Sequence, residues 1–318
     1  MVAVHFRGSV IKEIPFVNLR NISVLCDGVS FSSNLVKACA ENKISIDFFG
    51  KDGIPYSLLL PPSFFSAELG MAQLVAYSNG KGLNMIRMFV YGKINNQANL
   101  IKYYGKYYLK RNNAFKTAFP IYIDTMEKYA EACLQLEHRN IDEFRLKMFA
   151  IEGQASARYW EMVELLIRSK TGFVGRERQG ATDLVNCMLN YGYGMLYARI
   201  TEAIVRARLN PCLSYLHKPE GNRPSLVFDL IEEFRQQAVD KVIIALVIKN
   251  KNLKIENGLL DDTTRKLVAK KVIDRINAME KFRKHEMRCC EIIQWQANAL
   301  AHYLDGTAKT YKPYMPKW

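Results

Sequence analysis

The stretch ATDLVNCMLNYGYGMLYARITEAIVRARL, residues 181–209, is the clearest indication of what kind of fold the chain has. Its apolar side chains recur at positions i, i+3 and i+4, the spacing that lines up one face of an α-helix. The same spacing returns in NNQANLIKYYGKYY at 95–108 and in IDTMEKYAEACLQLE at 123–137. The chain is therefore predicted to be helical from about residue 65 onward.

The part of the chain before residue 64 has a different pattern. Short runs rich in Val, Ile and Phe alternate with the turn-forming pairs DG and PP and the triplet KDG, which is typical of strands. These runs are VAVHF (2–6), ISVLC (22–26), ISIDFF (44–49) and YSLLL (56–60). Between them, SSNLVKACAENK at 32–43 has the cap and the spacing of a short helix.

Together the two patterns predict an α+β protein with two domains. A small β-rich N-terminal domain is expected over residues 1–63, followed by a linker over 64–80. A larger, all-helical domain is expected over 81–304, and a basic, loosely ordered tail over 305–318. About 63 residues make a marginal domain, so the β-rich part is expected to pair with a second copy or to lean on the helices.

The charge of the chain points to a polyanionic partner. Its 318 residues include 45 Lys and Arg against 31 Asp and Glu, a formal net charge of +14. Such an excess favours binding to nucleic acid or to an anionic membrane surface. The longest apolar run, residues 242–248, is too short to span a bilayer, and the N-terminus lacks the features of a signal peptide. A cytoplasmic protein is expected, with no membrane association.

Several common chemistries find no support in the sequence. The seven cysteines form no CxxC pair, which argues for reduced thiols and against a zinc ribbon. No GxxxxGK[ST] loop, GxGxxG turn, GxSxG elbow or HExxH pair occurs. A nucleotide-hydrolysing motor or a zinc protease is therefore not indicated.

The stretch SYLHKPEGNRPSLVFDLIEEFRQ, residues 214–236, contains an unusual number of ionisable groups. Asp229 is expected to cap a helix that runs on through the apolar residues 242–248. On that helix Glu232 falls on a row that becomes apolar, whereas Glu233 falls on a polar row expected to face solvent, with Gln236, Gln237, Asp240 and Lys241. Because a carboxylate on a buried row needs a partner or a metal ion, Glu232 is the preferred functional acid.

Two further residues are candidates for the same chemistry. Glu152, in FAIEGQASARYWEMV, shares a row with apolar residues and has small residues around it; a helix–helix hydrogen bond would also explain it. His217 follows an apolar pair and precedes a loop containing proline and glycine, and a purely structural role is the alternative. Two glutamates and a histidine suit Mg²⁺ or Mn²⁺. In a basic chain, such a set indicates phosphoryl transfer on nucleic acid.

Three blocks in order resemble the CRISPR-associated protein one family, the integrase-nuclease of CRISPR adaptation. They are AIEGQASARYW (150–160), residues 181–218 ending in CLSYLHK, and SLVFDLIEEFRQQAVDKVI (225–243); GKINNQANLI (92–101) also resembles the family's first long helix. The resemblance implies the same two-domain fold. It also implies a homodimer formed largely through the β-rich domains, and assembly with the small CRISPR-associated protein two.

The resemblance also implies an activity and its residues. The family's metal-binding glutamate matches Glu152, its histidine matches His217 and its acid in DLxE matches Glu232. A Mg²⁺ or Mn²⁺ ion would support attack by a DNA 3′-hydroxyl on a phosphodiester, inserting protospacer DNA at a CRISPR repeat. With water as the nucleophile, the same site would act as an endonuclease. A catalytically idle DNA-binding scaffold and a basic RNA-binding module are the alternatives.

The chain departs from the family pattern at two positions. Where the family often has Gly-Leu before the proline that precedes the histidine motif, this chain has Arg208-Leu209. Where the family often has glycine two residues before the leucine of the Leu-His pair, this chain has Ser214. Both positions concern loop geometry and lie outside the expected ligands.

DNA contacts are expected from basic and polar residues near these blocks. They should bind largely through phosphates, so affinity should fall steeply with salt. KYYGKYYLKRNN at 102–113 could form a stacking surface for bases, although an amphipathic helix with its tyrosines in the core is favoured. The individual candidates are Arg158, Arg176, Arg178, Asn186, Asn190, Tyr191, Tyr193, Lys218, Arg223 and Arg235.

Overall fold

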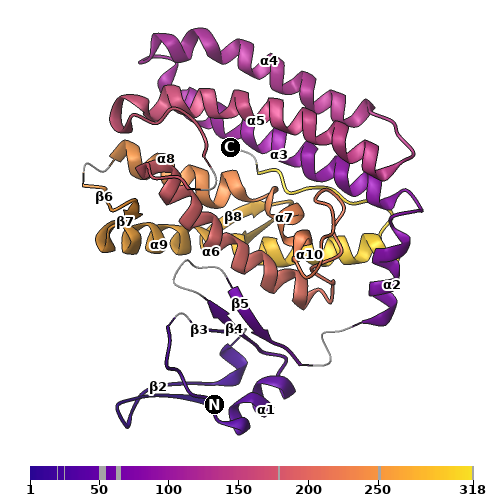
Figure 1. Cartoon of the computed structure of the whole chain (residues 1–318), viewed down its shortest axis with the longest axis vertical. Helices are drawn as coiled ribbons and strands as arrows, with labels where there is room; N and C mark the ends of the chain where they lie inside the picture. Colours follow the sequence, from indigo (N-terminus) through magenta and orange to yellow (C-terminus); the bar gives the residue numbers. More distant parts are fainter. Residues whose placement is uncertain are drawn as a thin grey trace. The chain divides into compact units, whose positions relative to one another are not determined.

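A computed structural model describes residues 1–19, 21–24, 26–49, 55–61, 66–177, 180–249 and 252–316. The chain divides into two compact units, Met1–Ala67 and Glu68–Trp318. The first is rich in strands and the second is mostly helical (Figure 1), so the predicted α+β class is confirmed.

The first unit contains a hairpin and a small mixed sheet. Strands β1 (Val2–Phe6) and β2 (Ser9–Ile14) form the antiparallel hairpin. In the sheet, β3 (Asn21–Val24) runs parallel to β4 (Ser45–Phe49), and β5 (Pro55–Leu59) runs antiparallel to β4. A single turn of 3₁₀ helix, η1 (Phe16–Asn18), precedes β3, and helix α1 (Ser33–Glu41) connects β3 to β4.

The sequence predicted most of this unit. The short helix begins where expected, because the Ser32 hydroxyl accepts a hydrogen bond from the Leu35 amide at 3.2 Å, which caps α1. Strand β2 was missed, because hardly any of its side chains is buried and it therefore lacks an apolar alternation. The KDG turn expected at residues 51–53 lies outside the described residues.

The second unit is built on two groups of helices. Helices α3 (Lys81–Tyr108), α4 (Asn113–Gln135) and α5 (Ile141–Thr171) pack against one another and form the upper layer in Figure 1. Below them, α6 (Leu184–Arg206) packs against its neighbours in space, α7, α9 and α10. The remaining helical elements are α2 (Ala67–Val75), α7 (Ser225–Ile231), the π-helical η3 (Gln236–Asp240), α8 (Lys241–Lys249), α9 (Asp262–Ile276) and α10 (Cys289–Asp305).

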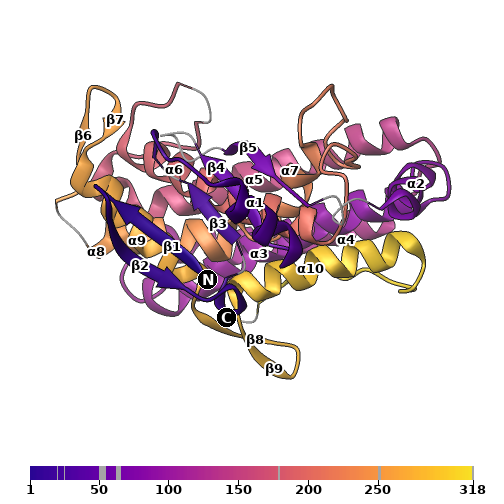
Figure 2. The same ribbon diagram turned by 90° about the horizontal axis from the view of Figure 1, so that it is seen from below.

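The expectation of an all-helical second domain was wrong in one respect. Two short hairpins interrupt the helices, β6 (Ile255–Glu256) with β7 (Leu259–Leu260) and β8 (Met279–Phe282) with β9 (His285–Arg288). Asn257 and Gly258 turn the first hairpin with positive φ angles of 52° and 76°, the Asn-Gly turn that favours hairpins. Figure 2 shows β8–β9 projecting from the helical unit.

Residues 66–80, expected to lie in a linker, contain α2 instead. The Gln73 side chain on this helix is fully buried, accepting a hydrogen bond from the Asn210 amide at 2.8 Å and donating one to the Asn210 carbonyl at 3.1 Å. The backbone carbonyl of Gln73 accepts a hydrogen bond from the Tyr215 hydroxyl at 3.0 Å. Helix α2 is thus fastened to the loop that follows α6.

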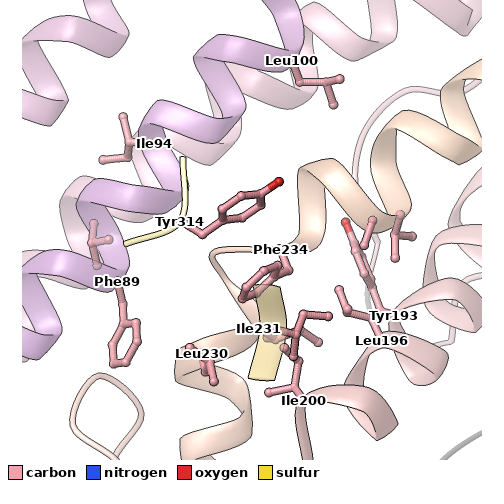
Figure 3. Close-up of a cluster of buried hydrophobic side chains, with 14 of the residues drawn as sticks. Phe89, Ile94, Leu100, Tyr193, Leu196, Ile200, Leu230, Ile231, Phe234 and Tyr314 are labelled. Carbon is pink, nitrogen blue, oxygen red and sulfur yellow. The ribbon is translucent and has the colours of Figure 1, made fainter. Parts of the chain in front are cut away.

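The basic tail was expected to be loosely ordered, and this was wrong for the described residues 306–316. Tyr311 and Tyr314 are only 3% and 1% exposed, because their rings add apolar area to the core. Figure 3 shows Tyr314 facing Phe234, with which it stacks at 5.1 Å between ring centroids. The chain passes close to α3 here, since a Cβ on Gly92 would meet Pro313 at 2.6 Å.

No helix among the described residues is long and apolar enough to cross a membrane.

Candidate active site

Glu152 and Lys93 bring α5 and α3 together at the centre of the candidate site. The Lys93 ammonium pairs with Glu152 Oε1, and both side chains are nearly buried, at 8% and 12% exposure. Ser156, one turn further along α5, donates a hydrogen bond to the same oxygen at 2.8 Å. Gln97, one turn after Lys93 on α3, donates to the Ser156 hydroxyl at 3.1 Å. Glu152 therefore faces α3, and its inward direction is the one that its helical row predicted.

Glu232 reaches the same ammonium group from another part of the chain. It follows the last residue of α7, is 5% exposed, and places Oε2 2.6 Å from Lys93 Nζ. Its other oxygen, Oε1, accepts a hydrogen bond from Arg235 Nε at 3.0 Å. The structure thus brings Glu152 and Glu232 to one shared cation, although 80 residues separate them in the sequence (232 − 152).

The charges around these two carboxylates keep both ionised. Burial by itself raises the pKa of Glu232, but the charges of Arg235 and Lys93 outweigh it and lower the pKa to about 2. Burial likewise acts to raise the pKa of Glu152, and Lys93 again reverses the direction, with a net pKa below the ordinary value. Both groups are therefore anions at neutral pH.

His217 is fixed by Asp229 rather than by the glutamates. Asp229 is fully buried on α7, and its Oδ1 lies 2.8 Å from His217 Nδ1. The same carboxylate accepts hydrogen bonds from the backbone amides of Tyr215, Leu216 and His217 at 2.7–2.9 Å. A carboxylate with these partners is an acceptor, so it assigns the proton of a neutral imidazole to Nδ1. Nε2 is then left with its lone pair available to a ligand.

The loop that carries His217 is held from two sides. Arg145, on α5 and 5% exposed, donates from Nε to the Tyr215 carbonyl at 2.8 Å. Ser214 is fully buried, and its hydroxyl lies 2.6 Å from that of Ser225 at the start of α7. One helix, α5, therefore supports the histidine loop through Arg145 and carries Glu152 two turns further on.

The His217 ring lies toward the same side of α5 as Glu152. It packs edge-on against Phe149, with 5.5 Å between ring centroids, and Phe149 precedes Glu152 by three residues on α5. Residues three apart lie on the same helix face.

In this structure the two carboxylates of the site converge on the Lys93 ammonium group. No group of three or more His, Cys, Asp or Glu side chains is placed to hold a metal within the described ranges. Lys93 Nζ instead occupies the place of a cation between the two carboxylates. The donor set, two carboxylates and one imidazole nitrogen, nevertheless has the chemistry that Mg²⁺ or Mn²⁺ requires.

The expectations for the neighbours of Glu232 were wrong. Glu233 and Asp240 are fully buried, and Gln236 and Gln237 are at most 2% exposed, because the helix stops at Ile231 and resumes as the π-helical η3. The number of residues per turn differs here from that of a regular α-helix. The side chains that were expected to form an exposed polar face therefore point into the core. Asp229 is no N-cap either, because α7 begins at Ser225 and Asp229 serves the histidine loop.

Lys93 and Asp229 are functional candidates that the sequence reasoning missed. Lys93 lies on the buried face of α3 with Phe89, Val90 and Gln97, and a lysine on an otherwise buried row was the available signal. For Asp229, the signal was its place inside an apolar run, which suits a buried acceptor as well as a cap.

The basic residues predicted to contact DNA are either exposed or half-buried. Arg158, Lys218 and Arg223 are exposed, whereas Arg176 and Arg235 are half-buried; Arg178 lies outside the described residues. The Arg223 guanidinium lies 4.8 Å from the centre of the Phe228 ring, which itself packs on His217. Lys218 and Arg223 therefore place exposed positive charge on the histidine loop itself.

The polar candidates on α6 are mostly engaged within the protein. Asn186 is 1% exposed. Its side-chain oxygen accepts hydrogen bonds from Arg176 and from the Glu177 backbone amide, and its side-chain NH₂ donates to the Gly175 carbonyl and to the Asp183 carboxylate. The buried Tyr193 hydroxyl donates to Asp240, while Asn190 accepts a hydrogen bond from Arg176 and Tyr191 is half-buried. Asn186 and Tyr193 are thus accounted for by packing.

The tyrosines of residues 102–113 also include both buried and exposed side chains. Tyr104 is buried and donates to the Lys241 carbonyl at 3.2 Å, as a core residue would. Tyr103 and Tyr107 are 39% and 51% exposed. The favoured amphipathic helix is therefore present, with two of its tyrosines directed outward.

A profile of the family described as "CRISPR associated protein Cas1" matches residues 1–274. The chain belongs to this family. It is 28% identical over 337 residues to the CRISPR-associated endonuclease Cas1 1 of Archaeoglobus fulgidus, covering 100% of this chain and 95% of that protein. It is 34% identical over 242 residues to a CRISPR-associated endonuclease Cas1 1 of Pyrobaculum aerophilum, covering 76% and 74%.

Solved structures share the fold at lower identity. A Cas1 protein from Thermotoga maritima aligns with a TM-score of 0.70 and 22% identity, over 93% of this chain and 89% of that one. A casposase bound to an integration product gives 0.73 and 19%, over 95% and 82%. A Cas6-RT-Cas1–Cas2 complex gives 0.75 and 17%, over 98% of this chain and 34% of that one.

Proposed function

We propose that this protein is a divalent-metal-dependent DNA integrase and endonuclease that inserts spacer DNA into a CRISPR array. The observation that carries the proposal is the convergence of Glu152 and Glu232 on one cation position. The His217 ring packs on Phe149, three residues before Glu152 on α5, and supports the proposal. Membership of the Cas1 family supports it, as does the fold shared with a casposase bound to an integration product.

Each residue has a definite part in this proposal. Glu152, Glu232 and His217 Nε2 would hold Mg²⁺ or Mn²⁺, which supplies charge neutralisation at the phosphate and activates the attacking hydroxyl. Asp229 would accept the Nδ1 proton of the imidazole, so that Nε2 faces the ion with its lone pair, and would fix the orientation of the ring. Arg235 and Ser156 hold the two carboxylates by their own hydrogen bonds.

The reaction is a transesterification. The 3′-hydroxyl oxygen of the incoming strand forms a bond to the target phosphorus, and the bond from that phosphorus to the target's own 3′ oxygen breaks. The hydroxyl proton is given up, and the departing oxygen takes a proton to become a new 3′-hydroxyl. With water as the nucleophile the same exchange is hydrolysis, which is the nuclease activity.

The DNA is proposed to lie across the exposed cations around the histidine loop. Arg158, Lys218 and Arg223 are exposed, and each phosphate that such a residue neutralises should steepen the salt dependence of binding. Protospacer DNA and the CRISPR repeat are the proposed substrates. A second copy of the chain and the small CRISPR-associated protein two are the proposed partners, and the similarity to a complex that contains Cas1 and Cas2 supports the latter.

The test is strand transfer of a short duplex into supercoiled DNA with Mn²⁺ or Mg²⁺. Glu152→Ala, His217→Ala and Glu232→Ala should each lose more than about 100-fold of the rate, beyond the range typical of supporting residues. Glu161→Ala is the matched control, because Glu161 is exposed on α5 and pairs only with Arg158 among the described residues. Wild-type rates in all three variants would refute the site.

Strand transfer, together with a binding competition between RNA and duplex DNA, separates the alternatives. A catalytically idle scaffold would bind DNA but give no strand transfer with either ion. A basic RNA-binding module would prefer single-stranded RNA over duplex DNA with 3′ overhangs and would not need a divalent ion.

A further inference from the structure

Lys93 lies at the centre of a cluster that is already neutral. Glu152 and Glu232 contribute two negative charges, and Lys93 and Arg235 contribute two positive charges, linked by the ion pairs at 2.6 Å (Lys93–Glu232) and 3.0 Å (Arg235–Glu232) and by that between Lys93 and Glu152. A divalent cation entering this cluster would give it a net charge of +2. Because unbalanced buried charge is strongly unfavourable, the ion and the ammonium compete for one place.

The lysine is well suited to give up that place. An ammonium group on a flexible four-carbon stem is a compact point charge that can swing away as a unit. Arg235, by contrast, donates from Nε to Glu232 Oε1 and lies over the Tyr193 ring at 4.5 Å, so it is held by two contacts. Of the two cations, Lys93 is the one whose departure leaves the surrounding packing in place.

Each of the two carboxylates keeps a hydrogen bond to another side chain when Lys93 moves away. Glu152 retains the hydrogen bond from Ser156, which Gln97 supports in turn. Glu232 retains Arg235 on Oε1, while Oε2 pairs with the Lys93 ammonium at 2.6 Å and has no other hydrogen-bond partner among the described residues. The oxygen that faces Lys93 would therefore become free for another cation without loss of the side chain's orientation.

We propose that Lys93 is an exchangeable internal cation, which holds Glu152 and Glu232 together in the metal-free protein and yields its place when a divalent ion binds. This inference rests on the proposed function, since it concerns the same metal ion. Lys93 is thus a positioning residue. It keeps two buried carboxylates from repelling each other before the ion arrives, and it lowers the affinity for the ion by competing with it.

Lys93→Met tests the competition, because methionine has a similar length and no charge. Lys102→Met is the matched control, since Lys102 is on the same helix but is 43% exposed and pairs with Glu127 at 3.3 Å. Binding of Mn²⁺ alone is measured by titration calorimetry, and thermal unfolding is followed with and without Mn²⁺. Lys93→Met should bind Mn²⁺ at least about tenfold more tightly than wild type, or about 1.4 kcal/mol.

The effect of Lys93→Met on the melting temperature should depend on whether Mn²⁺ is present. Without metal, Lys93→Met should melt below wild type, because two carboxylates lose their shared cation; with Mn²⁺ the difference should shrink or vanish. Lys102→Met should match wild type in both conditions. A residue that only packs would lower the melting temperature equally with and without Mn²⁺.

Lys93→Arg keeps the proposal testable if the methionine variant does not fold. Arginine retains the charge, so this variant should fold and should bind Mn²⁺ no more tightly than wild type. Tighter Mn²⁺ binding by Lys93→Arg would overturn the competition.

The outcomes distinguish this inference from the proposed function. Equal Mn²⁺ affinity in wild type and Lys93→Met would overturn the exchange while leaving metal-dependent catalysis in place. Absence of Mn²⁺ binding in wild type and in both Lys93 variants would overturn the exchange and the metal dependence of the proposed function together.

Discussion

Asp229 Oδ1 lies 2.8 Å from His217 Nδ1, and the same carboxylate binds three consecutive backbone amides of the histidine loop. This single buried side chain therefore sets the position, orientation and tautomer of the imidazole. Asp229→Asn would place an amide NH₂ among these donors, so at least one hydrogen bond would be lost and Nδ1 would lose its acceptor.

We expect Asp229→Asn to lower the affinity for Mn²⁺ and the rate of strand transfer by about 10- to 100-fold. Titration calorimetry and the strand-transfer assay measure the two effects. Because Asp229 acts through His217, the double variant with His217→Ala should lose no more activity than His217→Ala alone. Additive losses would mean that Asp229 has a role independent of the histidine.

Glu233 should make the protein less stable as the pH rises. Burial raises its pKa to about 7, although Tyr311, the Tyr314 amide and Gln296 donate hydrogen bonds to it. The native state keeps this proton up to about pH 7, whereas the unfolded chain releases it near its ordinary pKa of 4.5. Between these values the native state binds more protons, so the free energy of unfolding falls with rising pH.

The size of this effect is about 3 kcal/mol for a shift of this extent. Denaturant unfolding at pH 5 and pH 8 measures it as the difference between wild type and Glu233→Gln, in which the group cannot ionise. Asp240, whose pKa burial raises to about 6, contributes in the same direction and remains in the variant. Identical pH dependence in the two proteins would show that Glu233 does not titrate in this range.

Helical periodicity was enough to find the inward direction of Glu152, because α5 is regular over Ile141–Thr171. The same periodicity failed beyond the end of α7. Beyond Ile231 the backbone makes a turn and then a π-helical segment, so the assumed rotation of 100° per residue no longer holds. Glu233 consequently faces the core, although the same rule placed it in solvent.

The partners of the buried polar groups could not be predicted from local sequence. Lys93 meets carboxylates from α5 and from the end of α7, and Glu233 meets Tyr311 and Tyr314 from the C-terminal segment. These contacts depend on tertiary packing between distant elements, whereas residue patterns report mainly on a residue's own helix or strand. The residue patterns and the family resemblance both pointed to Glu152, His217 and Glu232, but neither pointed to the lysine among them.

Arg208 occupies a position where glycine should be more stable. It follows the C-cap of α6 with a φ angle of 62°, and its amide donates to the Val205 carbonyl at 2.9 Å. The next amide, of Leu209, donates to the Ile204 carbonyl at 3.1 Å. These two hydrogen bonds define a helix ending that usually carries glycine, and the family often has glycine at this position.

Arg208→Gly should therefore raise the free energy of unfolding by about 0.5 to 1 kcal/mol, since the left-handed conformation strains any side chain with a Cβ. Arg208→Ala is the control, because it removes the exposed side chain but keeps the Cβ. Urea unfolding should place glycine above both arginine and alanine. If alanine stabilises as much as glycine, the side chain and not the backbone angle is the cause.

Tyr314 should be a main support of the core beneath the candidate site. Its ring stacks on Phe234 at 5.1 Å and an interplanar angle of 17°, and its carbonyl accepts a hydrogen bond from Asn96 at 2.8 Å. Asn96 also donates to the Glu233 carbonyl at 2.9 Å. The C-terminal segment thereby ties α3, which carries Lys93, to the backbone next to Glu232.

Tyr314→Ala should lower the free energy of unfolding by about 3 to 5 kcal/mol, as loss of a large buried aromatic ring does. Tyr314→Phe is the matched control, because it keeps the ring and both backbone hydrogen bonds and should lose much less. Urea unfolding should show a lower midpoint with an unchanged slope for the alanine variant. A loss below about 1 kcal/mol, the scale of a surface substitution, would mean that the C-terminal segment is not part of the core in solution.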